Sequence, residues 1–292
     1  MTIIIKVFAS FDNSENCKRI YEKMCETHLI SEYGIDKKYY ITDQDDYTHV
    51  IILNTAMPEL KIPRENVIGF AFEPIPFLNL TPTFVEYAKR YISKYYIGDL
   101  HPSLPTDVFI EKYSYMWHNP PITIQSSKPK IMSIMVSHKQ YAPGHQYRHT
   151  LVKKILELNL PIDIYGNGCK NYENNMTDDI PNTYIKGSFE ANEPYVDYQF
   201  HICIENFVTN HYFSEKITNT LLCGTTPVYL GCKNINDYFP NNVICLTGDV
   251  NKDIVKLMNI LKNPKNYQKK IDIPKIKDHL NFVKHIPDFF RK

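Results

Sequence analysis

Three polar side chains that could together bind a ligand lie close together in the stretch IENFVTNHYFSEKITNTLLCGTTPVYLG, residues 204–231. If residues 212–223 form an α-helix, Tyr212, Glu215 and Lys216 share one face, while apolar side chains share another. A lysine ammonium suits a diphosphate, and a carboxylate can accept hydrogen bonds from ribose or sugar hydroxyls. The tyrosine could support either group. The spacing therefore favours a site for a phosphorylated ligand that carries hydroxyls.

The predicted helix has start and stop signals on both sides of the cluster. Asn210 is the expected N-cap and Gly224 the expected residue after the C-cap. The free N–H groups at the start of a helix attract anions, and in open α/β sheets ligands bind beyond the carboxyl ends of strands. Glu215 and Lys216 could instead be merely solvated on an amphipathic helix, but their position soon after the apolar strand 200–206 favours a ligand site.

Short apolar runs alternate with helical patterns along the first half of the chain. We expect strands at residues 2–9, 48–54, 66–72 and 94–100, and helices at 13–28 and 81–92. This alternation is typical of a parallel sheet covered by helices on both faces.

A second series with the same alternation follows a proline-rich stretch at 118–130. Its expected strands are 130–137, 161–168, 200–206, 226–231 and 242–248, and its expected helices are 144–159, 212–223 and 250–263. The sequence therefore predicts an α/β protein with two Rossmann-like domains, at residues 1–127 and 128–275. A helical tail, 276–292, is expected to pack back on the first domain, although its apolar residues could also bind a membrane surface.

Composition excludes several classes of function. The net charge is +1 with no long basic run, so neither nucleic acid nor an anionic membrane is the expected partner. The seven scattered cysteines include no Cys-x-x-Cys pair, which predicts buried free thiols in a reducing compartment and no zinc site. No apolar run reaches the length of a membrane span or a signal peptide, so we expect a soluble, cytoplasmic protein.

Three weaker motifs suggest other chemistry. An Asp-x-Asp occurs in DQDD at 43–46 and could bind a metal, but acidic turns are common. His201 and Cys203 share one face of a strand, where a Cys/His hydrolase is conceivable and a buried structural cysteine is the simpler reading. The glycines of GNG, 166–168, have the wrong spacing for a dinucleotide fingerprint.

The stretch 200–231 resembles the signature of the α-1,3-fucosyltransferase family. In that family an aromatic-rich strand leads to a Glu-Asn pair, a Tyr-x-x-Glu-Lys helix start and a Gly-x-x-Pro-Val strand. The matching residues here are Glu205 and Asn206, Tyr212 with Glu215 and Lys216, and Gly224 with Pro227 and Val228. Upstream, residues 136–168 are similar to the family's strand, arginine-bearing helix and Asp-x-Tyr-Gly strand, which makes Arg148 the counterpart of its diphosphate-binding arginine.

The resemblance implies the glycosyltransferase B architecture, in which two Rossmann-like domains face a cleft and the configuration at the anomeric carbon is inverted. It also implies that the donor nucleotide lies mainly on the second domain and that a carboxylate of the first domain is the base. Glu73, in GFAFEPIPFLN, is the expected base, although the family usually has Gly-Glu-Asn there. If Glu73 is not the base, Asp99 is the expected alternative base.

The expected function is transfer of a sugar, fucose from GDP-fucose, to a glycan hydroxyl, on GlcNAc or glucose, by an enzyme of the soluble microbial or viral type. If the protein is viral, its expected location is the host cytoplasm. Arg148 and Lys216 would neutralise the departing diphosphate, so no metal or other cofactor is expected. Two alternatives stay open. The first is a different donor sugar, because Ile204 and Thr218 replace aromatic residues that the family usually has. The second is a non-catalytic protein that binds a nucleotide sugar or a glycan.

Overall fold

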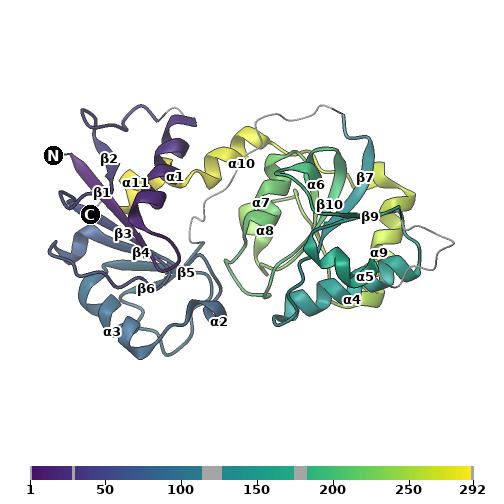
Figure 1. The fold of residues 1–292 in the computed structure, drawn as a ribbon, viewed down its shortest axis with the longest axis horizontal. Coiled ribbons are helices and arrows are strands. Elements are labelled where there is room, and N and C mark those ends of the chain that lie inside the picture. The colour runs from purple at the N-terminus through teal and green to yellow at the C-terminus, as the bar shows by residue number, and fades with distance from the viewer. Residues whose placement is uncertain (1, 28–29, 114–126, 174–182, 291–292) are drawn as a thin grey trace. The chain divides into compact units, whose positions relative to one another are not determined.

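The computed structural model describes residues 2–27, 30–113, 127–173 and 183–290. The chain forms two compact units: one joins Met1–Trp117 to Leu280–Lys292, and the other is His118–His279 (Figure 1). The proline-rich stretch 118–130 lies mostly outside the described residues.

The first unit is built on a parallel sheet with the strand order β2-β1-β3-β4-β5-β6. Its strands are β1 (Ile3–Ala9), β2 (Tyr39–Thr42), β3 (His49–Leu53), β4 (Val67–Phe70), β5 (Lys94–Ile97) and β6 (Phe109–Glu111). Its helices are α1 (Ser14–Thr27), the 3-10 turn Arg64–Asn66, α2 (Ile75–Leu78), α3 (Pro82–Tyr91) and α11 (Phe282–Phe289). The order of the strands changes direction between β1 and β3, which is where α/β sheets bind ligands.

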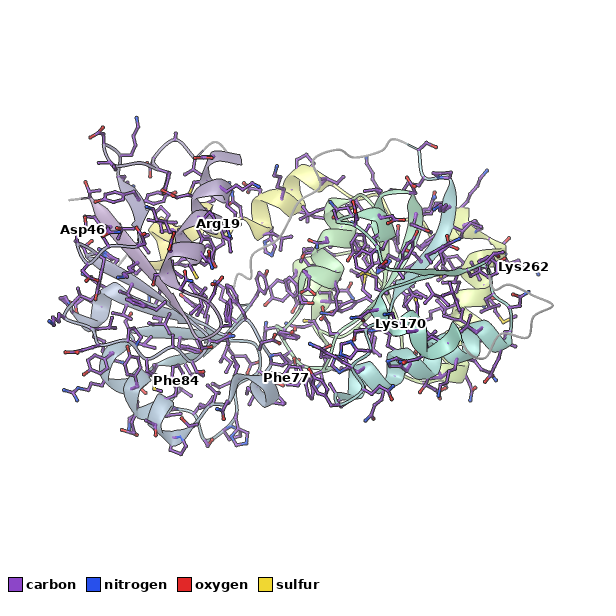
Figure 2. All side chains as sticks on the ribbon, in the orientation of Figure 1. Arg19, Asp46, Phe77, Phe84, Lys170 and Lys262 are labelled. Atoms are coloured by element: carbon purple, nitrogen blue, oxygen red, sulfur yellow. The ribbon has the colours of Figure 1, made fainter. Side chains whose placement is uncertain are left out.

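Helix α11 comes from the far end of the chain and completes one face of the first sheet. Phe282, Val283 and Ile286 are fully buried with the apolar side of α1. On the opposite face the covering helix is α3, whose Phe84 (labelled in Figure 2) is also buried and contacts Tyr95 of β5 at a ring-centroid distance of 5.4 Å. The apolar side of α11 is therefore buried within its own unit, where it cannot serve as a membrane-binding surface.

The second unit has the strand order β12-β11-β10-β7-β8-β9, again all parallel. Its strands are β7 (Lys130–Met135), β8 (Asp163–Tyr165), β9 (Ile185–Gly187), β10 (Tyr198–Ile204), β11 (Thr226–Leu230) and β12 (Ile244–Cys245). Its helices are α4 (Pro143–Glu157), α5 (Lys170–Glu173), α6 (Glu193–Val196), α7 (Glu215–Leu222), α8 (Ile235–Tyr238) and α9 (Val250–Lys262), with 3-10 turns at Asn167–Cys169 and Pro264–Asn266, and α10 (Ile273–Leu280) follows. In chain order this is the 3-2-1-4-5-6 arrangement of the Rossmann fold, with its change of direction between β7 and β10.

The predicted α/β class with two parallel-sheet domains is confirmed, and the long periodic elements lie where the sequence places them. The N-cap of α3 is Thr81, whose hydroxyl accepts a hydrogen bond from the Phe84 amide. The strands β2, β6 and β9 were not predicted.

The cysteines are all free, and the expectation that they are buried is wrong at one position. Six of the thiols are buried, whereas Cys245 is exposed in the short strand β12. In the described part of the chain, none of the helices combines the length and the apolarity that crossing a bilayer requires.

We expect Phe282→Ala to destabilise the protein strongly, because it leaves a cavity where the ring contacts Tyr21 and Phe70. The expected loss is about 3 to 5 kcal/mol of unfolding free energy, measured by urea denaturation. Lys284→Ala, at an exposed position of the same helix, is the matched control. Equal stability of the two variants would show that α11 does not contribute to the core.

Candidate functional site

The helix that carries the predicted anion site begins at Glu215, three residues later than expected. The N-cap is Ser214, not Asn210, because the Ser214 hydroxyl accepts a hydrogen bond from the Lys216 amide. His211 has a φ of 54°, so the chain turns sharply before the helix starts. The C-terminal end of the helix is where the sequence predicts it, because Gly224 follows the C-cap residue Cys223 with a φ of 67°.

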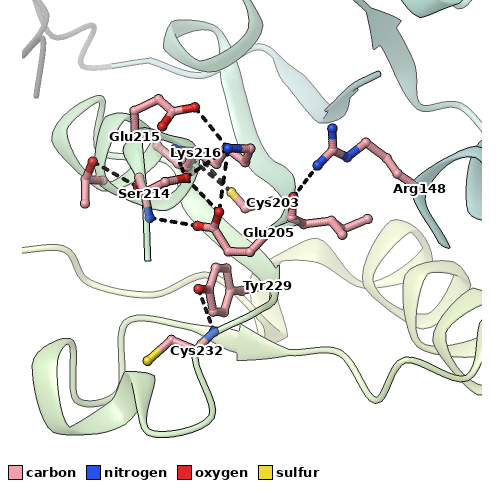
Figure 3. Close-up of polar contacts among 11 residues, drawn as sticks. Arg148, Cys203, Glu205, Ser214, Glu215, Lys216, Tyr229 and Cys232 are labelled. Atoms are coloured by element: carbon pink, nitrogen blue, oxygen red, sulfur yellow. Dashed lines mark hydrogen bonds and ion pairs between the residues drawn. The ribbon is translucent and has the colours of Figure 1, made fainter. Parts of the chain in front are cut away.

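The carboxylate of Glu205 is completely buried directly after β10 and holds the start of α7 in place (Figure 3). One carboxylate oxygen accepts a hydrogen bond from the Ser214 amide at 2.9 Å. The other accepts one from the Ser214 hydroxyl at 2.7 Å and lies 3.6 Å from the Lys216 ammonium. Through these contacts Glu205 positions the start of α7 and the Lys216 side chain. Its own side chain has no access to solvent.

Two glycines make room for Glu205. A Cβ atom at Gly231 would lie 2.4 Å from the Glu205 Cγ. A Cβ atom at Gly144, in the first turn of α4, would lie 1.8 Å from the Glu205 carbonyl oxygen. The Gly144 amide instead donates to the Asn206 carbonyl at 3.0 Å, so α4 is fixed against the end of β10.

That contact also places Arg148, one turn further along α4. The Arg148 guanidinium is almost fully buried and donates a hydrogen bond to the carbonyl of Ile204, the last residue of β10. Burial lowers the pKa of Arg148, and Glu205 partly opposes that shift. An arginine side chain nevertheless keeps its charge at neutral pH, so the site contains a fixed cation.

Lys216 supplies the second cation and is held by three neighbours. Its ammonium donates to the Ser214 hydroxyl and the Glu215 carboxylate, each at 3.0 Å, besides its ion pair with Glu205. Burial works against the charged lysine, but the two carboxylates outweigh burial and raise the pKa of Lys216. Burial also works against the charged form of Glu215, but Lys216 outweighs it and the pKa of Glu215 is lowered. Both groups are therefore charged at neutral pH.

A cavity of about 400 Å³ lies at the carboxyl edge of the second sheet. Its walls come from the ends of β7, β8 and β10, from the loop after β9, and from Arg148, Glu215 and Lys216. The volume is within the range of small-ligand sites, roughly 300 to 1,000 Å³. Two cations and a half-exposed carboxylate thus face one ligand-sized space.

The predicted donor-site residues divide into three groups. Arg148, Glu215 and Lys216 line the cavity, whereas Glu205 is fully buried and does not line it. Asn206 contributes its carbonyl to the contact with α4, and Tyr212 is buried in the loop before α7, outside the helix on which the spacing placed it.

The candidate bases belong to the first unit. Glu73 is half-buried between β4 and α2, and Asp99 is half-buried two residues after β5. Both therefore lie near the carboxyl ends of neighbouring strands of the first sheet.

Sequence reasoning missed two residues of the site, Ser214 and Phe189. Ser214 joins Glu205 to Lys216, and a serine directly before Glu-Lys is an N-cap signal that could have identified it. Phe189 lines the cavity from the loop after β9, a strand that was not predicted because its sequence, IKG, contains only one apolar residue.

The weaker motifs have structural explanations. Burial lowers the pKa of His201 to about 3 and raises the pKa of the Cys203 thiol well above its usual value, so neither is activated as a base or nucleophile. His201 Nδ1 contacts the Ser133 hydroxyl at 2.7 Å, while the Cys203 thiol lies against Thr220. In DQDD, Asp43 and Asp45 form ion pairs with Lys18 and Lys6. The described residues contain no cluster of three or more His, Cys, Asp or Glu side chains suited to a metal ion.

Residues 125–271 match the model of glycosyltransferase family 10 (fucosyltransferase), C-terminal part, which covers half of the chain. An α-(1,3)-fucosyltransferase B of Drosophila melanogaster is 25% identical over 187 residues, which are 62% of this chain and 38% of that protein. A GDP-fucose protein O-fucosyltransferase 3 of Xenopus laevis is 23% identical over 182 residues, which are 62% of this chain and 36% of that protein. The chain thus aligns with little more than a third of these curated relatives.

Solved structures show similarity of fold at low sequence identity. An α1,3-fucosyltransferase with GDP-fucose superposes over the whole chain and 91% of its own, with a TM-score of 0.54 and 13% identity. HepE of Anabaena, in complex with UDP-glucose, superposes over 99% of this chain and 98% of its own, with a TM-score of 0.58 and 8% identity. Both comparisons support the glycosyltransferase B architecture.

We expect Glu205→Ala to destabilise the protein, because it leaves the amide and hydroxyl of Ser214 without their acceptor and Lys216 without its buried partner. The expected loss is about 3 kcal/mol in chemical denaturation. Glu157→Ala removes an exposed carboxylate that pairs with Lys154 and should change stability by less than about 0.5 kcal/mol. A loss for Glu205→Ala as small as the control's would refute the organising role of Glu205.

Proposed function

We propose that this chain, which belongs to glycosyltransferase family 10, transfers fucose from GDP-fucose to an acceptor hydroxyl. The observation that carries the proposal is the cavity at the carboxyl edge of the second sheet, where Arg148 and Lys216 lie together with the carboxylate of Glu215. A nucleotide sugar needs cations for its diphosphate and acceptors for its hydroxyls, and this cavity offers both. The names of the curated relatives agree with fucose as the sugar.

In the proposed complex, Arg148 and Lys216 bind the diphosphate, and Glu215 accepts hydrogen bonds from the ribose or fucose hydroxyls. Asn206 and Tyr212 support the loop between β10 and α7. The proposed role of Glu205 is to position Lys216, since the fully buried carboxylate cannot reach a ligand.

The proposed reaction is a single displacement. A carboxylate removes the proton from the acceptor hydroxyl as its oxygen forms a bond to the anomeric carbon of fucose. The bond from that carbon to the diphosphate oxygen breaks, the electron pair leaves with the diphosphate, and the configuration inverts. Arg148 and Lys216 stabilise the charge that develops on the leaving group. Because these two side chains supply the positive charge that the leaving diphosphate needs, the proposed reaction includes no metal ion.

Glu73 is the proposed base, and Asp99 is its alternative. The position of Glu73 supports this choice, because it follows β4 at the carboxyl edge of the first sheet, close to the change of strand direction between β1 and β3.

The proposed acceptor is a hydroxyl of a glycan. The protein O-fucosyltransferases among the relatives favour a second candidate, a hydroxyl of a protein side chain. Both candidates share the same donor and the same displacement chemistry, so an acceptor screen should include glycans and folded protein domains.

Lys216→Ala should weaken GDP binding by roughly 10- to 100-fold in titration calorimetry, because a hydrogen bond to a charged group contributes about 1.5 to 3 kcal/mol. Lys262→Ala, an exposed lysine at the end of α9, is the control and should bind as the wild type does. A chelator should leave both affinities unchanged. An unaltered dissociation constant for Lys216→Ala would remove Lys216 from the site, and a loss of binding with chelator would add a metal to it.

Glu73→Gln should reduce fucosyl transfer by about 10²- to 10⁴-fold while GDP affinity stays at the wild-type value, because amides cannot act as the base. Asp99→Asn, measured in parallel, identifies the alternative base. Full transfer by Glu73→Gln would exclude Glu73. Wild-type GDP binding without turnover on any acceptor would favour a non-catalytic binding protein.

A further inference from the structure

An exposed aromatic ring lies in the cavity at the side away from the charged residues. Phe189 follows β9 and is 37% exposed, although it lines the cavity. In the sheet order, β9 is three strands away from β10, which leads into α7. At about 4.8 Å per strand, this separation is roughly 14 Å. The cavity therefore extends from an aromatic side to a side with Arg148 and Lys216.

The ring of Phe189 is supported by a buried hydrogen-bonded chain. Phe189 lies against Tyr165 at a centroid distance of 6.2 Å with an interplanar angle of 86°. The Tyr165 hydroxyl contacts that of Tyr198 at 2.8 Å, and Tyr198 donates to the Asp163 carboxylate at 2.6 Å. Tyr165 and Tyr198 are both buried, so the support is part of the core. A perpendicular contact with Tyr165 leaves at least one face of the Phe189 ring for another planar group.

At this end of the cavity, close backbone contacts join the ends of β7, β8 and β9. Gly187, two residues before Phe189, has a φ of 76°, and its carbonyl accepts a hydrogen bond from the Gly166 amide. A Cβ atom at Gly166 would lie 2.3 Å from the Val136 carbonyl oxygen. Val136, Gly166 and Phe189 all line the cavity together with their uncharged polar neighbours Ser137, Asn167 and Ser188. This end therefore lacks the charged groups of the other end.

We propose that Phe189 stacks on the base of the nucleotide donor and thereby sets the direction in which the donor lies. This inference rests on the proposed function, because it assumes a nucleoside diphosphate with a flat base at one end and charge at the other. The base occupies the β9 side and the diphosphate lies between Arg148 and Lys216. Stacking is tolerant of base identity, so Phe189 contributes affinity and orientation and does not itself distinguish guanine from other bases.

The test compares Phe189→Ala and Phe189→Trp with the control Leu158→Ala. Leu158 is the C-cap residue of α4, and its exposure is similar to that of Phe189. Titration calorimetry with GDP and with inorganic pyrophosphate separates the base from the phosphates. We expect Phe189→Ala to weaken GDP binding roughly 10-fold, because base stacking on an aromatic ring contributes about 1 to 3 kcal/mol. Pyrophosphate binding should not change, Phe189→Trp should retain wild-type GDP affinity, and Leu158→Ala should bind both ligands normally.

Fluorescence gives a second readout that a purely structural role would not produce. Trp117 is the single tryptophan of the sequence, so Trp117→Phe combined with Phe189→Trp reports on position 189 alone. GDP should quench this signal, whereas pyrophosphate should not.

The outcomes separate the inference from the proposed function. Wild-type GDP affinity in Phe189→Ala, or an equal loss for GDP and pyrophosphate, overturns the stacking role and leaves the function in place. If the wild type binds a different nucleoside diphosphate and Phe189→Ala weakens that ligand but not pyrophosphate, the donor assignment fails and the stacking role is supported. Absence of binding to any nucleoside diphosphate overturns both.

Discussion

The buried carboxylate of Glu205 is the interaction on which the candidate site depends. An uncompensated carboxylate inside a protein is strongly unfavourable, so its oxygens must find donors nearby. Here the donors are the amide and hydroxyl of Ser214 and the ammonium of Lys216, all at the beginning of α7. The hydrogen bonds and the ion pair that Glu205 requires thus fix the start of α7 and the position of the Lys216 ammonium. The geometry of the cavity follows from that requirement. Gly144 and Gly231 leave the space that Glu205 occupies, because a Cβ atom at either position would clash with it.

Charge balance explains why this arrangement suits an anionic ligand. Arg148 and Lys216 are matched by Glu205 and Glu215, which offset part of the cost of burying two cations. Only Glu215 of the two carboxylates reaches the cavity, and it is half exposed. In the proposed complex, a diphosphate would therefore meet two preorganised cations and one hydrogen-bond acceptor, while the Glu205 carboxylate does not line the cavity.

Sequence reasoning predicted the fold well and the site in part. Long segments show a clear hydrophobic pattern in the sequence. For this reason β1, α3, α4, β10 and α9 lie close to where they were expected. The position of Lys216 after a buried strand was enough to predict an anion site. The start of α7 was misplaced because helical spacing continues backward through Tyr212, whereas the actual boundary depends on Glu205, which is nine residues before Ser214 in the chain. The aromatic side of the cavity depends on β9, whose three residues give no periodic signal. Tertiary contacts of this kind cannot be read from local patterns.

The origin of α11 determines the order in which the chain can fold during synthesis. The first unit contains the earliest residues, yet Phe282, Val283 and Ile286 of its core are made only after the whole of the second unit. At about 5 to 20 residues per second, a ribosome needs roughly 10 to 30 s to add that unit. Through this interval the sheet of the first unit exposes the apolar face that α11 later covers. Until α11 is made, the N-terminal sheet is therefore the part of the nascent chain whose apolar face is incompletely covered.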